Sequence, residues 1–302
     1  MPPPTRVTFG PHEMDLPGDA LGELRDSSSL LCSAEALRER LAEDGYLLLR
    51  GLYEPRLVES ARRQMLERLD AGGALDRSCL LDEARTAEGN NGAFRGGKNE
   101  LTSCHSYREL VRGPRTLKFF SFLRGGDAIA FDYEWLRVVG TGGRTGAHFD
   151  IVYMGRGTPN LLTMWTPLGD VRYEHGPLAI CVGSHKAPGF SRLRETYGKM
   201  DVDRDRVAGW FSEDPLEIRD RFGGSWKTTE FAAGDAVIFG MFTLHASLTN
   251  VSKQFRLGSD TRYQLASEPI DERWVGREPK GHYAWHSGPE IPIAVKRAEW
   301  GV

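Results

Sequence analysis

The stretch Gly146 to Asp150, with the sequence GAHFD, places a histidine and an aspartate two positions apart. If this stretch is a strand, His148 and Asp150 point to the same face, because successive side chains of a strand alternate. A neutral imidazole and a carboxylate that converge on one point are suitable ligands for a divalent metal ion. One further nitrogen ligand would complete the set of two histidines and one carboxylate that holds Fe(II) in non-heme iron sites.

His245 is the best candidate for that third ligand among the eight histidines of the chain. It follows an apolar strand-like run that a Gly-Asp turn opens, and a small polar residue, Ser247, comes two positions later. The predicted metal-binding and catalytic set is therefore His148, Asp150 and His245. The other histidines are expected to have structural or solvent-exposed roles: His12, His105, His175, His185, His282 and His286.

Arg256 is the candidate for binding an acidic co-substrate. It lies on the chain after His245, just before the strand-like residues 261–264. The planar guanidinium of an arginine can bind a carboxylate through two parallel hydrogen bonds. A lone His-x-Asp pair, a lone histidine or a lone arginine would each be weak evidence, but their order along the chain makes the combination more specific.

Composition and charge exclude several classes of partner. The chain has 302 residues and a net charge of -3, which gives no reason to expect binding to nucleic acid or to an acidic membrane. The first residues lack the apolar core of a signal peptide, and no stretch is long and apolar enough to span a bilayer. The four cysteines are scattered and are expected to be reduced thiols. These features predict a cytoplasmic protein.

The first part of the chain predicts an arm followed by helices. Residues 1–33 are rich in Pro, Gly and Asp and are expected to have little regular structure. Ser33 can cap a helix that ends at Gly45, and residues 46–50 indicate a short buried strand. Pro55 opens a second helix with apolar residues at helical spacing, and residues 115–123 indicate a third.

From Ile129 onward the pattern changes to short apolar, β-branched runs separated by turn residues. Many short strands with turn signals favour a β-sandwich or barrel over alternating strands and helices. Residues 187–230 interrupt the strands and are expected to form a long insertion over the β core. The predicted organisation is an arm (1–33), a central domain (34–268, with the insertion at 187–230) and a C-terminal tail (269–302).

Three segments resemble the phytanoyl-CoA dioxygenase (PhyH-like) family of Fe(II)/2-oxoglutarate-dependent oxygenases. The three segments are LAEDGYLLLRGLYEPRLVESARRQMLERL, AHFDIVYMGRGTPNLLTMWTPLGDVRYEHGPLAICVGSHK and GDAVIFGMFTLHASLTNVSKQFRLGSDTRYQ. The resemblance runs from about Ala34 to Ala266. It implies a mainly β fold: a double-stranded β-helix (jelly-roll, cupin-like) core with flanking N-terminal α-helices and a long inserted loop. Three departures are Ala147, where the family often has a bulky residue, Val182-Gly183, where a proline is usual, and the insertion and the tail after Glu268, which have no specific match.

The resemblance also implies roles for individual residues. His148, Asp150 and His245 would bind Fe(II), and dioxygen would be the second co-substrate beside 2-oxoglutarate. Four further residues would surround 2-oxoglutarate: Arg256 at its distal carboxylate, Ser247 assisting, Trp165 beside it, and Arg137 facing its other carboxylate or the substrate.

The predicted reaction is hydroxylation of an unactivated C–H bond in a small-molecule metabolite or natural product, with release of succinate and CO2. Desaturation, cyclisation or epoxidation would use the same cofactors. Another class stays open, a cupin-like protein that binds a metal or ligand without catalysis, although such a protein needs neither the full triad nor Arg256. Arginines in glycine-rich segments or close to the His-Asp pair allow an anionic substrate: Arg95, Arg124, Arg137, Arg144 and Arg156.

Overall fold

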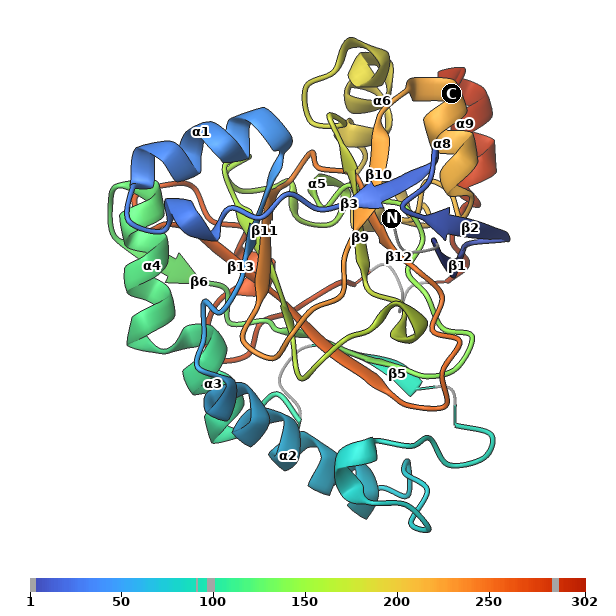
Figure 1. Ribbon diagram of the computed structural model, residues 1–302. Coiled ribbons are helices and arrows are strands. Elements are labelled where there is room, and N and C mark those ends of the chain that lie inside the picture. The colour runs from blue at the N-terminus through green and yellow to red at the C-terminus, as the bar shows by residue number, and fades with distance from the viewer. Residues whose placement is uncertain (1–3, 91, 97–100, 284–287) are drawn as a thin grey trace.

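Two β-sheets packed face to face form the core of the protein (Figure 1). The computed structural model describes residues 4–90, 92–96, 101–283 and 288–302. The larger sheet contains, in spatial order, β4 (Tyr46–Leu49), β11 (Ala236–Gly240), β8 (Leu162–Pro167), β13 (Arg256–Leu265), β7 (Trp135–Val139) and β5 (Gly92–Gly96), with β6 (Ala128–Ala130) beside β13. The smaller sheet contains β12 (His245–Ser247), β9 (Leu178–Val182), β10 (Ser225–Thr228) and β3 (Leu21–Glu23). The predicted jelly-roll class is confirmed.

The central strand β13 is buried on both faces, and its sequence alternates accordingly. Leu257 and Tyr263 belong to the apolar core on the outer face of the large sheet. Arg256, Asp260 and Arg262 have the opposite parity, so they point between the two sheets. Strand β13 therefore places charged side chains in the interior between the two sheets, where apolar side chains would be usual.

Four helices cover the outer face of the large sheet, on the left and at the bottom of Figure 1. They are α1 (Ala34–Asp44), α2 (Pro55–Ala71), α3 (His105–Arg112) and α4 (Pro114–Arg124). Ser33 caps α1 by accepting a hydrogen bond from the Ala36 backbone N–H, and Gly45 ends it with a left-handed φ of 82°. The predictions for α1, β4, α2 and α4 are confirmed, and α3 is a further helix of this layer.

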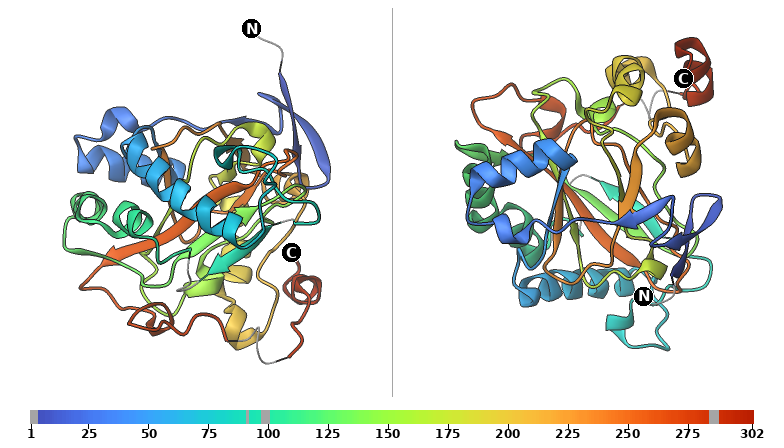
Figure 2. Two further views of the ribbon diagram at one scale, coloured as in Figure 1. Left: turned by 90° about the horizontal axis from the view of Figure 1, so that it is seen from below. Right: turned by 45° about the horizontal axis from the view of Figure 1, so that its top comes forward.

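The expectation that residues 1–33 have little regular structure is wrong. Strands β1 (Thr5–Phe9) and β2 (His12–Leu16) form a hairpin at the edge of the molecule away from helices α1 to α4 (Figure 2). Strand β3 pairs in parallel with β10 of the smaller sheet. The physical reason is that apolar and polar residues alternate along both strands, so that one face of the hairpin is buried: Val7, Phe9, Met14 and Leu16. The centroid of the Phe9 ring lies 5.0 Å from that of Trp226.

The insertion 187–230 is more structured than the loop that was expected. It contains α6 (Ser191–Glu195), α7 (Val202–Asp205) and α8 (Pro215–Phe222), and its last part is β10, which lies between β9 and β3. The C-terminal tail ends in α9 (Ile293–Trp300), close to α8 (Figure 1). Val207 of the insertion forms a parallel bridge with Ile291 of the tail, so the two segments meet. Within the described residues, no helix is both long and apolar enough to cross a bilayer.

Candidate active site

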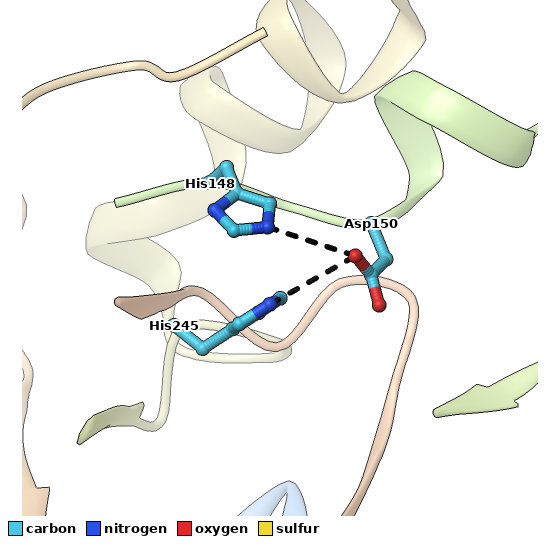
Figure 3. A group of neighbouring side chains, drawn as sticks. All are labelled: His148, Asp150 and His245. Atoms are coloured by element: carbon cyan, nitrogen blue, oxygen red, sulfur yellow. Dashed lines mark ion pairs between the residues drawn. The ribbon is translucent and has the colours of Figure 1, made fainter. Parts of the chain in front are cut away.

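His148, Asp150 and His245 converge between the two sheets, as predicted (Figure 3). The route to this arrangement differs from the expected continuous strand. His148 forms a bridge with His245 at the end of β12, but the backbone is helical at Asp150 (φ -66°, ψ -26°), the residue that opens the short helix α5 (Ile151–Met154). The turn after His148 therefore brings the carboxylate back to the two imidazoles.

The three side chains are nearly inaccessible and arranged around one point. Asp150 Oδ1 lies 3.7 Å from His148 Nε2 and 3.8 Å from His245 Nε2 (Figure 3). One ligand atom from each residue lies within 4.8 Å of the others, and no second cluster of this kind occurs in the part of the chain that the structure describes. Two nitrogens and one oxygen are the donor set of a non-heme iron site with open coordination positions.

Hydrogen bonds set both histidines in the tautomer that a metal needs. Nδ1 of His148 lies 2.8 Å from the Gly146 carbonyl, and Nδ1 of His245 lies 3.0 Å from the Thr243 carbonyl. A carbonyl oxygen can only accept, so each Nδ1 carries a proton and donates it. Each Nε2 then keeps a lone pair toward Asp150. Burial lowers the pKa of His245. Burial and the neighbouring His245 hold the pKa of His148 well below its usual value.

The second oxygen of Asp150 is bound by the protein itself. Thr163 Oγ1 donates to Oδ2, and Arg262 Nη2 lies 3.1 Å from the same oxygen. Burial alone would raise the pKa of Asp150, but the charge of Arg262, the two histidines and the Thr163 hydroxyl hold that pKa below its usual value. Oδ2 is thus occupied, and Oδ1 is left for a metal ion.

Arg262 was not predicted to belong to the site, although the sequence carried a signal for it. Its position has the same parity as Arg256 on one strand, so the two side chains must share a face. On the neighbouring strand β8, Thr163 is directly opposite Arg262, which explains why both contact Asp150.

Arg256 is buried beside the triad with an incompletely paired guanidinium. It is 3% exposed, and its Nε and Nη2 have no hydrogen-bond partner among the described residues. Burial, reinforced by the charge of Arg137, lowers the pKa of Arg256 to about 10, so the group is still charged at neutral pH. A buried, unpaired cation is costly, and a carboxylate that forms hydrogen bonds with it would remove that cost.

The other three predicted residues lie around the same small cavity as Arg256 and His245. Trp165 is buried on β8, and Ser247 Oγ accepts a hydrogen bond from the Thr145 backbone N–H at 2.9 Å. Arg137 is not unpaired: its Nε lies 2.5 Å from Asp260 Oδ2. The donors around the cavity suit a small dicarboxylate next to a metal ion.

A larger cavity of about 400 Å³ opens on the other side of His148 and Asp150. Its volume is within the range of small-molecule sites. Its walls come from the sheet, from the insertion and from the C-terminal tail, and include Trp135, Tyr153, Met154, Trp210, Arg262 and His282. The Ala147 backbone exchanges hydrogen bonds with Phe211 and Ser212, which attaches the insertion directly beside the triad.

Apart from His282, which lines the larger cavity, the remaining candidates that the structure describes lie away from the triad. His12 contacts Asp214, His175 contacts Gln254, His185 contacts the Ala42 carbonyl, and His105 is exposed at the start of α3. His282 is buried and contacts Asp203, while His286 and the side chain of Arg95 lie outside the described residues. Three arginines form ion pairs outside the larger cavity: Arg124 with Glu268, Arg144 with Glu213 and Arg156 with Asp201.

Comparison with known proteins agrees with this geometry. Residues 41–258 match the family described as phytanoyl-CoA dioxygenase (PhyH). The chain is 30% identical over 263 residues to 1-deoxypentalenic acid 11-beta-hydroxylase of Streptomyces exfoliatus, which covers 82% of this chain and 87% of that protein. It is 27% identical over 175 residues to L-proline trans-4-hydroxylase of Streptomyces griseoviridis, covering 52% of this chain and 63% of that protein.

A solved structure supports the fold. The epimerase SnoN from nogalamycin biosynthesis, in complex with Fe3+, alpha ketoglutarate and nogalamycin RO, superposes with a TM-score of 0.55 at 19% identity, covering 86% of this chain and 98% of that one. The family match spans most of the chain, and the triad fits the iron that the family uses. The chain belongs to the phytanoyl-CoA dioxygenase family of iron- and 2-oxoglutarate-dependent oxygenases.

Proposed function

We propose that His148, Asp150 and His245 hold Fe(II) and that Arg256 binds the distal carboxylate of 2-oxoglutarate. The observation that carries this proposal is the buried guanidinium of Arg256, whose Nε and Nη2 have no hydrogen-bond partner among the described residues, in the cavity that His148 and His245 also line. Ser247 and Trp165 are assigned to the walls of the co-substrate site. Arg137, already paired with Asp260, is assigned to the near side of that site.

The bound iron and 2-oxoglutarate would supply oxidation of a substrate C–H bond by dioxygen, with 2-oxoglutarate converted to succinate and CO2. The chain's own contribution is to hold the ligands and to position the substrate. His148 and His245 are fixed by their backbone hydrogen bonds, and Asp150 is fixed through its second oxygen. The wall of aromatic side chains in the larger cavity can orient one C–H bond and exclude water.

The proposed substrate is a small-molecule metabolite or natural product that carries a negative charge, and hydroxylation is the proposed outcome. The Streptomyces exfoliatus relative, 30% identical to this chain, hydroxylates a carboxylic acid according to its name. Desaturation, cyclisation and epoxidation are the alternative outcomes. The product mass separates hydroxylation and epoxidation of an alkene, which add one oxygen, from desaturation and cyclisation, which remove two hydrogens, and NMR separates the two members of each pair. Residues 34–268 are proposed to hold the metal and co-substrate site, and the tail completes the wall of the larger cavity through His282 and Glu290. A cytoplasmic location is proposed from the four free cysteines.

Anaerobic titration tests the assignment of Arg256. Fe(II) and 2-oxoglutarate together should give the wild-type protein a weak visible charge-transfer band. Arg256→Leu should raise the 2-oxoglutarate concentration that gives the half-maximal band by roughly 10- to 100-fold, since a charge-assisted hydrogen bond contributes about 1.5–3 kcal/mol.

Arg124→Leu is the matched control, because this arginine is paired with Glu268 away from the cavity. It should leave the titration unchanged. An unchanged titration in Arg256→Leu would show that another basic group holds the carboxylate.

A further inference from the structure

The charges around the triad do not cancel. Five charged side chains line the two cavities in or near the interior: Arg137, Arg256 and Arg262 against Asp150 and Asp260. Both histidines are neutral in the tautomer described above. An Fe(II) ion and a 2-oxoglutarate dianion cancel each other, so one positive charge remains in excess when both are bound. Glu290 also lines the larger cavity, but it is exposed and its charge is screened by water.

Of the three arginines, Arg262 is the one whose positive charge has no anionic partner of its own when iron and 2-oxoglutarate are bound. Arg137 has Asp260 as a close partner, and Arg256 is assigned to 2-oxoglutarate. Arg262 contacts Asp150, whose negative charge would be shared with the metal ion. Arg262 is 2% exposed, and its Nε and Nη1 have no hydrogen-bond partner among the described residues.

The ring of Trp135 holds the guanidinium in place. The Arg262 Cζ atom lies 4.6 Å from the centroid of the Trp135 ring, and both residues line the larger cavity. This contact limits the motion of the guanidinium, so a ligand that binds it loses little additional conformational freedom. The cavity therefore combines a fixed, incompletely paired cation with apolar walls from Met154 and Trp210.

We propose that Arg262 binds a carboxylate group of the substrate, and that the substrate is a monocarboxylic acid with an apolar skeleton. This inference rests on the proposed function, because it takes the larger cavity as the substrate site. A single carboxylate matches the single excess charge. Glu290 at the exposed rim disfavours a second anionic group at the outer end. Because Arg262 also contacts Asp150, the substrate carbons nearest the carboxylate would lie close to the iron.

Binding of paired acids and amides tests this proposal. The probes are cyclohexanecarboxylate, adamantanecarboxylate and abietate, each compared with its primary carboxamide, which has a similar shape but no charge. Affinity is measured anaerobically with Fe(II) and 2-oxoglutarate present, from tryptophan fluorescence, because Trp135 and Trp210 line the cavity. At least one acid should bind the wild-type protein about 10-fold or more tightly than its amide.

Variants separate recognition of the anion from support of Asp150. Arg262→Met should bring the affinity ratio of acid to amide close to one, and Arg262→Lys should keep most of the preference. Arg124→Met, which removes an arginine paired elsewhere, should keep the wild-type ratio. If Arg262 only positions Asp150, Arg262→Met will weaken acids and amides by the same factor.

Three results would overturn the proposal: that equal weakening, wild-type protein that binds acids and amides equally, and wild-type protein that binds none of the acids. Failure of the proposed function gives a different result. In that case Fe(II) and 2-oxoglutarate produce no charge-transfer band in the wild-type protein, whatever acid is added.

Discussion

At the scale of single residues, the site depends on which atom of each ligand is already occupied. Both histidines donate from Nδ1 to a backbone carbonyl, and Asp150 accepts through Oδ2. The three remaining atoms, two Nε2 and one Oδ1, are the ones that face each other. A metal ion therefore meets ligands whose orientation is fixed before it binds.

Replacing His245 should remove iron binding without unfolding the protein. His245→Ala should lower iron affinity by at least about 100-fold, because loss of a ligand exceeds the usual effect of losing its supporting contacts. The check is iron content after dialysis, with circular dichroism to monitor the fold. His175→Ala is the control, since this half-buried histidine contacts Gln254 outside the triad. Equal iron content in the two variants would contradict the assignment.

Asp150 and Arg262 should be strongly coupled in their effect on stability. Asp150→Gly leaves the buried Arg262 without its anion and should destabilise the metal-free protein by about 3 kcal/mol. The double variant Asp150→Gly/Arg262→Leu removes both charges and should lose less than the sum of the single variants. Denaturant unfolding of all four proteins measures this coupling. Additive losses would show that the ion pair contributes little.

At the scale of elements, the pocket depends on where the insertion lies against the triad. Ala147 forms an isolated bridge with Ser212, and Gly146 has no side chain to push the Trp210 ring away: a Cβ atom there would lie 2.8 Å from the ring. Tyr153 approaches Gly209 in the same close manner. The insertion thus forms a wall of the cavity through contacts that glycines permit.

Trp210→Ala should weaken substrate-dependent turnover more than the uncoupled conversion of 2-oxoglutarate. The Trp210 side chain lines the larger cavity and is 38% exposed, so truncation removes a wall without opening the core. Succinate release with and without substrate gives the two rates. Phe122→Ala removes an exposed aromatic residue on α4, away from the cavity, and should change neither rate. Equal loss of both rates in Trp210→Ala would indicate a structural role.

Sequence patterns predicted those parts of the fold and site that are coded locally. The capped helix α1, strand β4 and helix α2 each carry their own signals in adjacent residues, and so does the His-x-Asp pair. The insertion and the tail were predicted as segments, but their helices and strand β10 were not, because these depend on distant partners. Strand β10 is held between β9 and β3, which lie far from each other in the sequence. No local pattern specifies such a pairing.

At the scale of the whole molecule, a buried charge network fastens the tail to the insertion. Asp203 of α7 pairs with Arg273 and lies 3.0 Å from His282 Nδ1, and Arg273 also pairs with Asp271. All four side chains are at most 7% exposed. His282 in turn lines the larger cavity. The tail is therefore part of the folded domain and of the pocket.

Asp203→Ala should destabilise the protein by about 3 kcal/mol, because it leaves buried cationic and polar groups with fewer partners. Denaturant unfolding measures the loss. Asp220→Ala is the control within the same insertion: its side chain is 62% exposed and pairs only with the neighbouring Arg219 among the described residues, so the loss should be below about 1 kcal/mol. Similar losses in the two variants would mean that the network adds no more than a surface pair.

Because β3 pairs with the distant strand β10, the enzyme can acquire its metal only late in synthesis. Strand β3 leaves the ribosome long before its partner β10, residues 225–228. His148 likewise leaves it long before His245, with which it forms a bridge. Folding of this domain is then largely delayed until most of the chain has been translated, because its sheets join distant segments. Tight iron binding through all three ligands therefore cannot precede translation of residue 245, and a nascent chain arrested before that residue should retain no tightly bound iron.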